Sequence, residues 1–239
     1  MLDTQFRMHP MIATYISDNF YESKYRSGVG SEARTLEIGP FTKPICFIDT
    51  KNSKQKHEDE NEDAGTGFSN HFEATICADY LSTVIEAIET GNYGKNPKDL
   101  KLEDIGVITA YKKQIGEIRE RVRKSLCRHY PEEEARELAD KLSINTLDSF
   151  QGRDNQIIFY SFVRSNDGHS IGFLNEVRRL NVMMTRAKSL LVMVGDSETL
   201  EGSYARTLHD GKRAKEYFGK LVAYCKENGG YMDIAQVGE

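Results

Sequence analysis

Short apolar runs that alternate with amphipathic helical segments are the sequence feature that most restricts how this chain can fold. The runs are apolar on both faces and rich in β-branched and aromatic residues: "ICFIDT" from Ile45, "IGVITAY" from Ile105, "NQIIFYSFV" from Asn155 and "SLLVMVG" from Ser189. Strands of this kind, separated by helices, are typical of a mostly parallel sheet that is covered on both sides. We therefore predict an α/β domain of three layers.

Apolar residues at helical spacing predict the helices that accompany these strands. The first helix is indicated by Met11, Ile12, Tyr15, Ile16 and Phe20, and others are expected in "HFEATICADYLSTVIEAIET", "KKQIGEIRERVRKSL", "EVRRLNVMMTRAK" and "RAKEYFGKLVAYCKE". A further strand is expected in "KLSINTL". Residues 51–68 are almost wholly charged or small, and we interpret them as a flexible polar insertion that buries almost nothing, within one domain of residues 1–239.

Charge and cysteine content exclude several classes of protein. The formal net charge is −5, so any contact with nucleic acid has to be local and cannot come from a uniformly basic surface. The four cysteines lie far apart without the spacing of a zinc site, which predicts reduced structural thiols and no metal centre. No apolar stretch reaches the length of a membrane span and no signal-peptide pattern is present, so we expect no membrane contact and a location in the cytoplasm or nucleus.

Polar residues gather after the predicted strands. Thr109 and Tyr111 end one apolar run, Thr146 and Asp148 end another, and the turn "QGRD" from Gln151 to Asp154 follows directly. In open α/β sheets ligands bind beyond the carboxyl ends of the strands, so we expect all of these residues to line one edge. Any single Thr or Asp here could equally be an ordinary helix cap or turn residue.

Three longer stretches carry a family resemblance. "LDTQFRMHP", "INTLDSFQGRDNQIIFYSFVRSN" and "GFLNEVRRLNVMMTRAK" resemble motifs IV, V and VI of superfamily 1 helicases, in the order and spacing of the group that includes senataxin. "VITAYKKQ" is similar to the motif between IV and V of the same group. The resemblance implies a second RecA-like domain, part of an ATP-dependent motor that moves along single-stranded RNA or DNA. Its ATP and Mg²⁺ would be bound mainly by the N-terminal RecA-like domain of the same protein.

The resemblance also implies roles for particular residues. Arg7 and Arg186 correspond to arginine fingers for the γ-phosphate of ATP, a task that suits the planar guanidinium fork. Gln5, Phe6, Gly152 and Asp154 would contact the nucleotide: Phe6 would stack on the adenine, Gly152 permits close backbone approach, and Asp154 stands where relatives place a glutamate that contacts the ribose. The alternatives are a surface ion pair for Arg7, a helix C-terminal cation for Arg186 and a core position for Phe6.

A second set of residues would contact the nucleic acid. Thr109, Tyr111 and Thr146 would offer hydroxyls and backbone amides to phosphates, Tyr111 would add stacking on a base, and Lys112 and Lys113 would supply charge. The pair Arg178 and Arg179 has two interpretations, as functional cations or as partners in structural salt bridges.

The sequence lacks the parts of a complete ATPase. No Gly-x-x-x-x-Gly-Lys-[Ser/Thr] loop is present, and "GNYGKN" fails because its glycines are too close and Asn96 replaces the hydroxyl residue. We therefore expect a fragment of a larger helicase that is inactive when isolated. Two alternatives stay open: a non-catalytic nucleic-acid-binding module and a small nucleotide-dependent enzyme that works alone, against which the missing loop argues.

Overall fold

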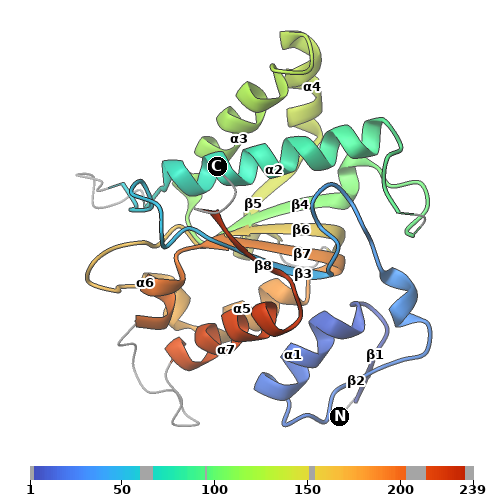
Figure 1. Cartoon of the computed structure of the whole chain (residues 1–239), viewed down its shortest axis with the longest axis vertical. Coiled ribbons are helices and arrows are strands. Elements are labelled where there is room, and N and C mark those ends of the chain that lie inside the picture. The colour runs from blue at the N-terminus through green and yellow to red at the C-terminus, as the bar shows by residue number, and fades with distance from the viewer. Residues whose placement is uncertain (1–2, 60–66, 95, 151–153, 203–213, 235–239) are drawn as a thin grey trace.

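A parallel sheet of six strands forms the centre of the molecule (Figure 1). The computed structural model describes residues 3–59, 67–94, 96–150, 154–202 and 214–234. The strand order is β5-β4-β6-β7-β3-β8, and every pairing in this sheet is parallel. The strands are β3 (Ile45–Asp49), β4 (Ile105–Thr109), β5 (Ser143–Thr146), β6 (Asn155–Ser161), β7 (Ala187–Gly195) and β8 (Tyr231–Asp233).

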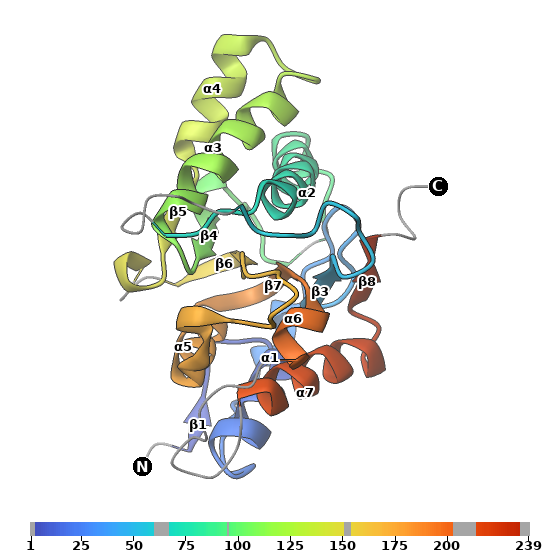
Figure 2. The same cartoon turned by 90° about the vertical axis from the view of Figure 1, so that its left-hand side faces the viewer.

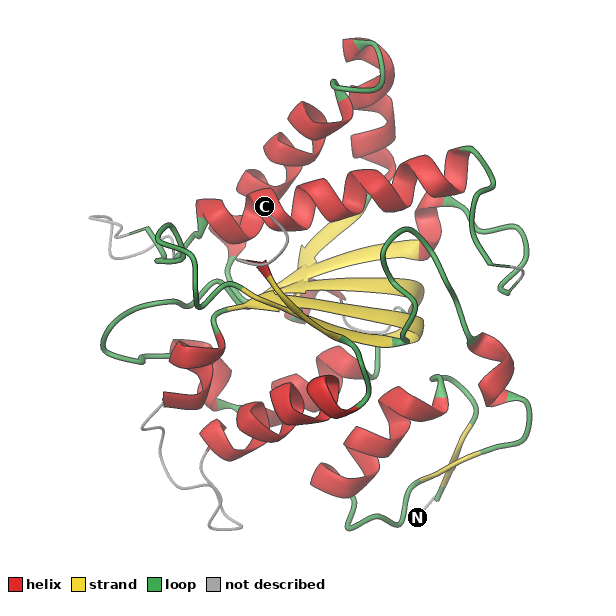
Figure 3. Cartoon of the chain, viewed as in Figure 1, coloured by secondary structure: helices red, strands yellow, loops and turns green. Residues whose placement is uncertain are grey.

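Helices cover both faces of this sheet, as Figure 2 and Figure 3 show. One face carries α2 (His71–Glu89), α3 (Lys112–Leu126) and α4 (Glu132–Lys141), and the other carries α1 (Pro10–Phe20), α5 (Val177–Met184), α6 (Ser197–Gly202) and α7 (Ala214–Glu227). Side chains of a strand point alternately to its two faces. On β7, Leu190 and Val192 therefore enter the core under α2, while Leu191 and Met193 enter the core over α5 and α7. The predicted α/β class is confirmed, and the arrangement is that of a RecA-like domain.

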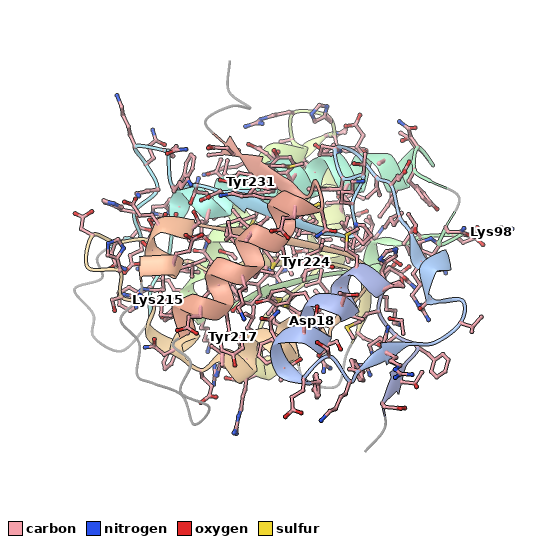
Figure 4. All side chains as sticks on the ribbon, turned by 60° about the horizontal axis from the view of Figure 1, so that its bottom comes forward. Asp18, Lys98, Lys215, Tyr217, Tyr224 and Tyr231 are labelled. Atoms are coloured by element: carbon pink, nitrogen blue, oxygen red, sulfur yellow. The ribbon has the colours of Figure 1, made fainter. Side chains whose placement is uncertain are left out.

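The first and last long helices, α1 and α7, pack against each other (Figure 4). The Tyr15 hydroxyl of α1 donates to the backbone oxygen of Tyr217 on α7 at 2.6 Å, and the Tyr224 hydroxyl of α7 donates to the backbone oxygen of Met11 at 2.8 Å. The rings of Tyr15 and Tyr224 lie 5.7 Å apart. These contacts fix the N-terminal segment, with its short parallel ladder of β1 (Thr4–Gln5) and β2 (Arg26–Ser27), to the body of the domain.

Several elements differ from the sequence-based expectation. Helix α5 ends at Met184, and Ala187 and Lys188 belong to β7 instead of the helix. Helices α4 and α6, strand β8 and the short 3₁₀ turns Ser31–Arg34, Leu102–Asp104, Asp148–Phe150 and Gly172–Asn175 were not predicted. Among the described residues, no helix combines the length and the apolar character needed to cross a membrane.

The polar segment 51–68 packs on the domain where the structure describes it. The carboxylate of Glu58 pairs with Arg164 at 3.0 Å, and the two side chains are only 8% and 7% exposed. Phe68 lies against the guanidinium of Arg164, at 3.9 Å from the ring centre, and against the ring of Tyr111. The expectation that this segment buries almost nothing is wrong, because composition does not reveal that Glu58 has a buried cationic partner more than a hundred residues away.

Candidate functional site

The amino ends of β6 and β7 bring the two predicted arginine fingers together. These strands are neighbours and run parallel, so Asp154 and Arg186, which precede them, lie side by side, and the Asn155 amide donates to the Arg186 backbone oxygen at 3.0 Å. Arg7 arrives from the N-terminal segment: its Nε lies 3.2 Å from Asp154 Oδ2, and its Nη1 donates to the Thr185 backbone oxygen at 3.3 Å. Residues from three distant segments therefore form one cluster.

This cluster has an excess of positive charge. Lys188 also pairs with Asp154, at 3.3 Å, so Arg7, Arg186 and Lys188 gather around a single carboxylate. Burial, together with the charge of Arg7, lowers the pKa of Arg186, while Asp154 opposes the effect. An anion with several negative charges would relieve the repulsion between these cations, and the guanidinium fork suits phosphate oxygens. We call Arg7, Asp154, Arg186 and Lys188 the arginine cluster.

Gln5 holds the turn that presents Arg7. Its side-chain oxygen accepts from the amides of Arg7 at 2.8 Å and Met8 at 2.7 Å, and its amide nitrogen donates to the Met8 backbone oxygen and to Ser27, each at 2.9 Å. The buried Gln5 thus uses both ends of its amide inside the domain. In this conformation Gln5 supports the turn that carries Arg7. Its direct contact with the nucleotide stays a prediction.

Phe6 presents its ring to solvent beside this turn. The ring is 63% exposed, so the alternative of a core position is excluded. It lies directly over Gly28, where the Cβ of any other residue would collide with the ring. Phe6 is therefore an open aromatic surface next to the arginine cluster. The predicted contact residue Gly152 falls outside the described residues.

The expected nucleic-acid residues lie at the opposite ends of the strands. Thr109 and Thr146 are paired in register where β4 and β5 end, whereas Asp154 precedes the start of β6. The expectation that nucleotide and nucleic-acid residues share one edge is therefore wrong. The chain crosses from the end of β5 back to the start of β6, and a parallel sheet separates those two points by the length of its strands.

Only one of these three residues is open in this conformation. Thr109 is fully buried, and Tyr111 is 3% exposed, with its ring between Phe68 at 5.3 Å and Phe173 at 5.5 Å. Thr146 is partly exposed, and its hydroxyl contacts that of Ser149 at 3.1 Å. A base would reach Tyr111 only if its cover moved.

The comparison with protein families identifies the domain. A family model described as an AAA domain matches residues 1–198, most of the chain. The chain belongs to this AAA domain family.

Curated relatives of this AAA domain are named as helicases. It is 33% identical to the DNA polymerase alpha-associated DNA helicase A of Schizosaccharomyces pombe, over 98% of this chain and 32% of the relative. It is 33% identical to the ATP-dependent helicase NAM7 of Saccharomyces cerevisiae over 83% of this chain and 19% of the relative, and 28% identical to the ATP-dependent helicase upf1 of Schizosaccharomyces pombe over 95% and 22%. These names support the superfamily 1 resemblance. The chain spans a third or less of the length of these relatives.

A buried polar network under Tyr111 in this AAA domain was missed by the sequence analysis. Gln114 accepts from the Asn70 amide at 2.8 Å and donates to Ser161 at 3.1 Å, and Ser161 donates to Glu73 at 2.7 Å. The amide of Val163, which has φ 73°, also donates to Glu73, at 2.8 Å. The network ties the starts of α2 and α3 to the end of β6.

The spacing of Asn70 and Glu73 matches a helix capping box and could have indicated one end of this network, although the sequence analysis did not use it. Asn70 does cap α2, accepting from the Glu73 amide at 2.9 Å. The Glu73 carboxylate, however, turns into the core, and Gln114 takes the Asn70 amide instead. Burial raises the pKa of Glu73 to about 8, with the negative charges of Asp196 and Glu58 adding to it and the hydrogen bonds from Ser161 and Val163 opposing it.

Proposed function

We propose that this AAA domain is the second motor domain of an ATP-dependent superfamily 1 helicase that acts on single-stranded RNA or DNA. The observation that carries the proposal is the convergence of Arg7 and Arg186 beside one carboxylate at the amino ends of β6 and β7. The helicase names of the relatives support it.

In this proposal the domain supplies charge to ATP that is held mainly by another RecA-like domain of the same protein. The excess positive charge of the arginine cluster fits a triphosphate, and the exposed ring of Phe6 fits the adenine. Arg7 and Arg186 would stabilise the charge that spreads over the γ-phosphate oxygens during phosphoryl transfer. Asp154 orients Arg7 and would contact the ribose.

Mg²⁺ would be bound by the other domain, together with most of the nucleotide. The described residues contain no group of three or more His, Cys, Asp or Glu side chains arranged for a metal ion. Bound Mg²⁺ would neutralise phosphate charge, while this domain's own residues position and stabilise the transferring group.

The decisive experiment removes each finger in the protein that contains this domain. We expect Arg186→Ala to lower kcat for ATP hydrolysis by about a hundredfold or more, with a smaller change in KM, and Arg7→Ala to behave similarly. Arg136→Ala, on the exposed face of α4, is the matched control and should leave kcat unchanged. Near-normal turnover in both finger variants would overturn the proposal.

A further inference from the structure

A column of aromatic rings and guanidinium groups runs from the buried side chain of Arg164 to the surface at the carboxyl ends of the strands. Its inner end is Arg164, followed by the rings of Phe68, Tyr111 and Phe173. Its outer end is Arg179, whose guanidinium carbon lies 5.9 Å from the centre of the Phe173 ring. The members of this aromatic column come from four separate parts of the chain, so it exists only in the folded domain.

Phe173 is the exposed ring of the aromatic column. Its side chain is 61% exposed, although its neighbour Leu174 and nearby Ile171 are both buried. These two buried residues already anchor the segment to the core, so the ring of Phe173 is not needed to hold the segment in place. Single exposed apolar residues are common on protein surfaces. What sets Phe173 apart is its ring contact with Tyr111 and the guanidinium of Arg179 beside it.

Gly172 allows the Phe173 ring to approach Tyr111. It has φ +52°, a conformation that favours glycine, and a Cβ at this position would collide with the Tyr111 hydroxyl and lie 2.7 Å from Arg164 Nη1. Tyr111 is fixed in turn, because its hydroxyl accepts from Arg164 Nη1 at 3.3 Å. The exposed face of Phe173 thus rests on a rigid base.

The surroundings of Phe173 favour a planar, charged partner over an apolar one. Ser170, Asn175, Glu176 and Arg178 are exposed and polar, so the ring is a single aromatic surface in a polar area. Arg179 beside it pairs with Asp148 at 3.3 Å, and both side chains are exposed. Exposed pairs of this type contribute little stability, so a phosphate can replace Asp148 at low cost. Thr146, at the end of β5, lies two residues from Asp148.

We propose that a base of the single-stranded nucleic acid stacks on Phe173, with Arg179 contacting the adjoining phosphate, so that Phe173 takes the stacking role that the sequence assigned to Tyr111. This inference rests on the proposed function. Base stacking on an aromatic side chain tolerates any sequence, because every base has a flat face, as a motor that moves along a strand requires.

The test uses the larger protein that contains this domain. It relies on the absence of tryptophan from the domain itself. Phe173→Trp introduces the domain's single tryptophan, and the difference in emission from the parent protein reports on it alone. We expect short oligo(dT) or oligo(U) to quench this emission as they bind. Val29→Trp, at an exposed turn after β2, is the matched control and should show no quenching.

The affinity of Phe173 variants for an oligonucleotide distinguishes base stacking on this ring from simple packing against Tyr111. Phe173→Ala and Phe173→Leu should each weaken binding of a labelled oligonucleotide about tenfold or more, the range for one lost stacked base, whereas Phe173→Trp should keep it. Leucine retains apolar contact with Tyr111, so recovery of affinity by Phe173→Leu would overturn the inference. Melting temperatures close to that of the parent protein would show that each variant folds.

The outcomes distinguish this inference from the proposed function. Oligonucleotide binding that leaves the tryptophan emission of the Phe173→Trp variant unquenched would overturn the inference and leave the helicase proposal intact. Loss of basal ATP hydrolysis at unchanged strand affinity would assign Phe173 to a contact with another protein domain and would also overturn it. A parent protein that binds no single strand at all would contradict the nucleic-acid function itself, and this inference with it.

Discussion

The two ends of the parallel sheet use polar residues in opposite ways. At the amino ends of β6 and β7, Arg7 and Asp154 are 45% and 33% exposed in their side chains, and they pair in a cluster with surplus positive charge. At the carboxyl ends of β4 and β6, Gln114, Ser161 and Glu73 are buried and joined in one hydrogen-bonded network. One end is open and electrostatically unbalanced, and the other is closed and internally satisfied apart from one oxygen of Glu73.

This difference indicates which end of the sheet can exchange its ionic partners for a ligand with little loss of stability. Exposed ion pairs contribute at most about 1 kcal/mol each, so a nucleotide could displace Asp154 from Arg7 with little loss of stability. Buried polar groups lose much more when a partner is removed, because water cannot replace it. The carboxyl-end network therefore acts as a rigid support, and among the described residues that cover it, the exposed Phe173 is the one that we propose to meet a ligand.

The largest effect should come from breaking the buried ion pair at the carboxyl end. Glu58→Gln keeps the shape but leaves the Arg164 charge without its counterion, and we expect it to lower the free energy of unfolding by about 3 kcal/mol or more. Denaturant titration measures this change. The double variant Glu58→Leu with Arg164→Met should recover much of the loss, and Glu133→Gln on exposed α4 is the control. Stability equal to the parent in Glu58→Gln would show that the segment is only loosely attached.

A second effect should appear in the pH dependence of stability, through Glu73. Its pKa is raised from about 4.5 to about 8, so between these values the folded protein keeps a proton that the unfolded chain has lost. Stability should therefore fall as pH rises through this window, by at most about 1.4 kcal/mol per pH unit. Glu73→Gln carries no ionisable group and should flatten that slope, whereas Glu133→Gln should follow the parent. Parallel pH profiles for Glu73→Gln and the parent would contradict this account.

The smallest effect on stability should come from the amino end. Asp154→Asn removes the charge that faces Arg7 and Lys188. Because the side chains of these pairs are partly open to water, we expect the free energy of unfolding to change by only about 1 kcal/mol. In the larger protein, KM for ATP should rise if Asp154 contacts the ribose, and Asp154→Glu should keep KM near the parent value. A large loss of stability in Asp154→Asn would remove the contrast between the two ends of the sheet.

Local patterns predicted much of the fold and part of the candidate site. The runs at Ile45, Ile105, Asn155 and Ser189 all form strands of the parallel sheet, because a strand buried on both faces has to be apolar along its whole length. Helix α3 begins and ends where its apolar spacing predicts. The motif resemblance named Arg7 and Arg186, which the structure places in one cluster, although their role as fingers stays a proposal.

Other features have no local signal. Strand β8 consists of three residues that form a strand only because β3 offers a free edge. Helix α4 is short, and only Ala135, Leu138 and Ala139 of its ten residues are buried. Glu58 and Lys56 look like solvated charges in a polar segment, and only their partners Arg164 and Asp196 show that they are packed on the domain.

The sequence by itself determined the parallel sheet, its covering helices and the residue types available for phosphate chemistry, since these depend on periodicity and on motifs that are contiguous in the chain. The tertiary structure decided which end of the sheet each residue occupies and whether it is open. Asp154 and Thr146 are close in sequence but stand at opposite ends of the strands, because the connection from β5 to β6 has to return along the sheet before a parallel strand can start. Tyr111 and Phe173 are both aromatic residues at the carboxyl end, yet one is buried and the other exposed, because residues distant in sequence cover the first ring and leave the second uncovered.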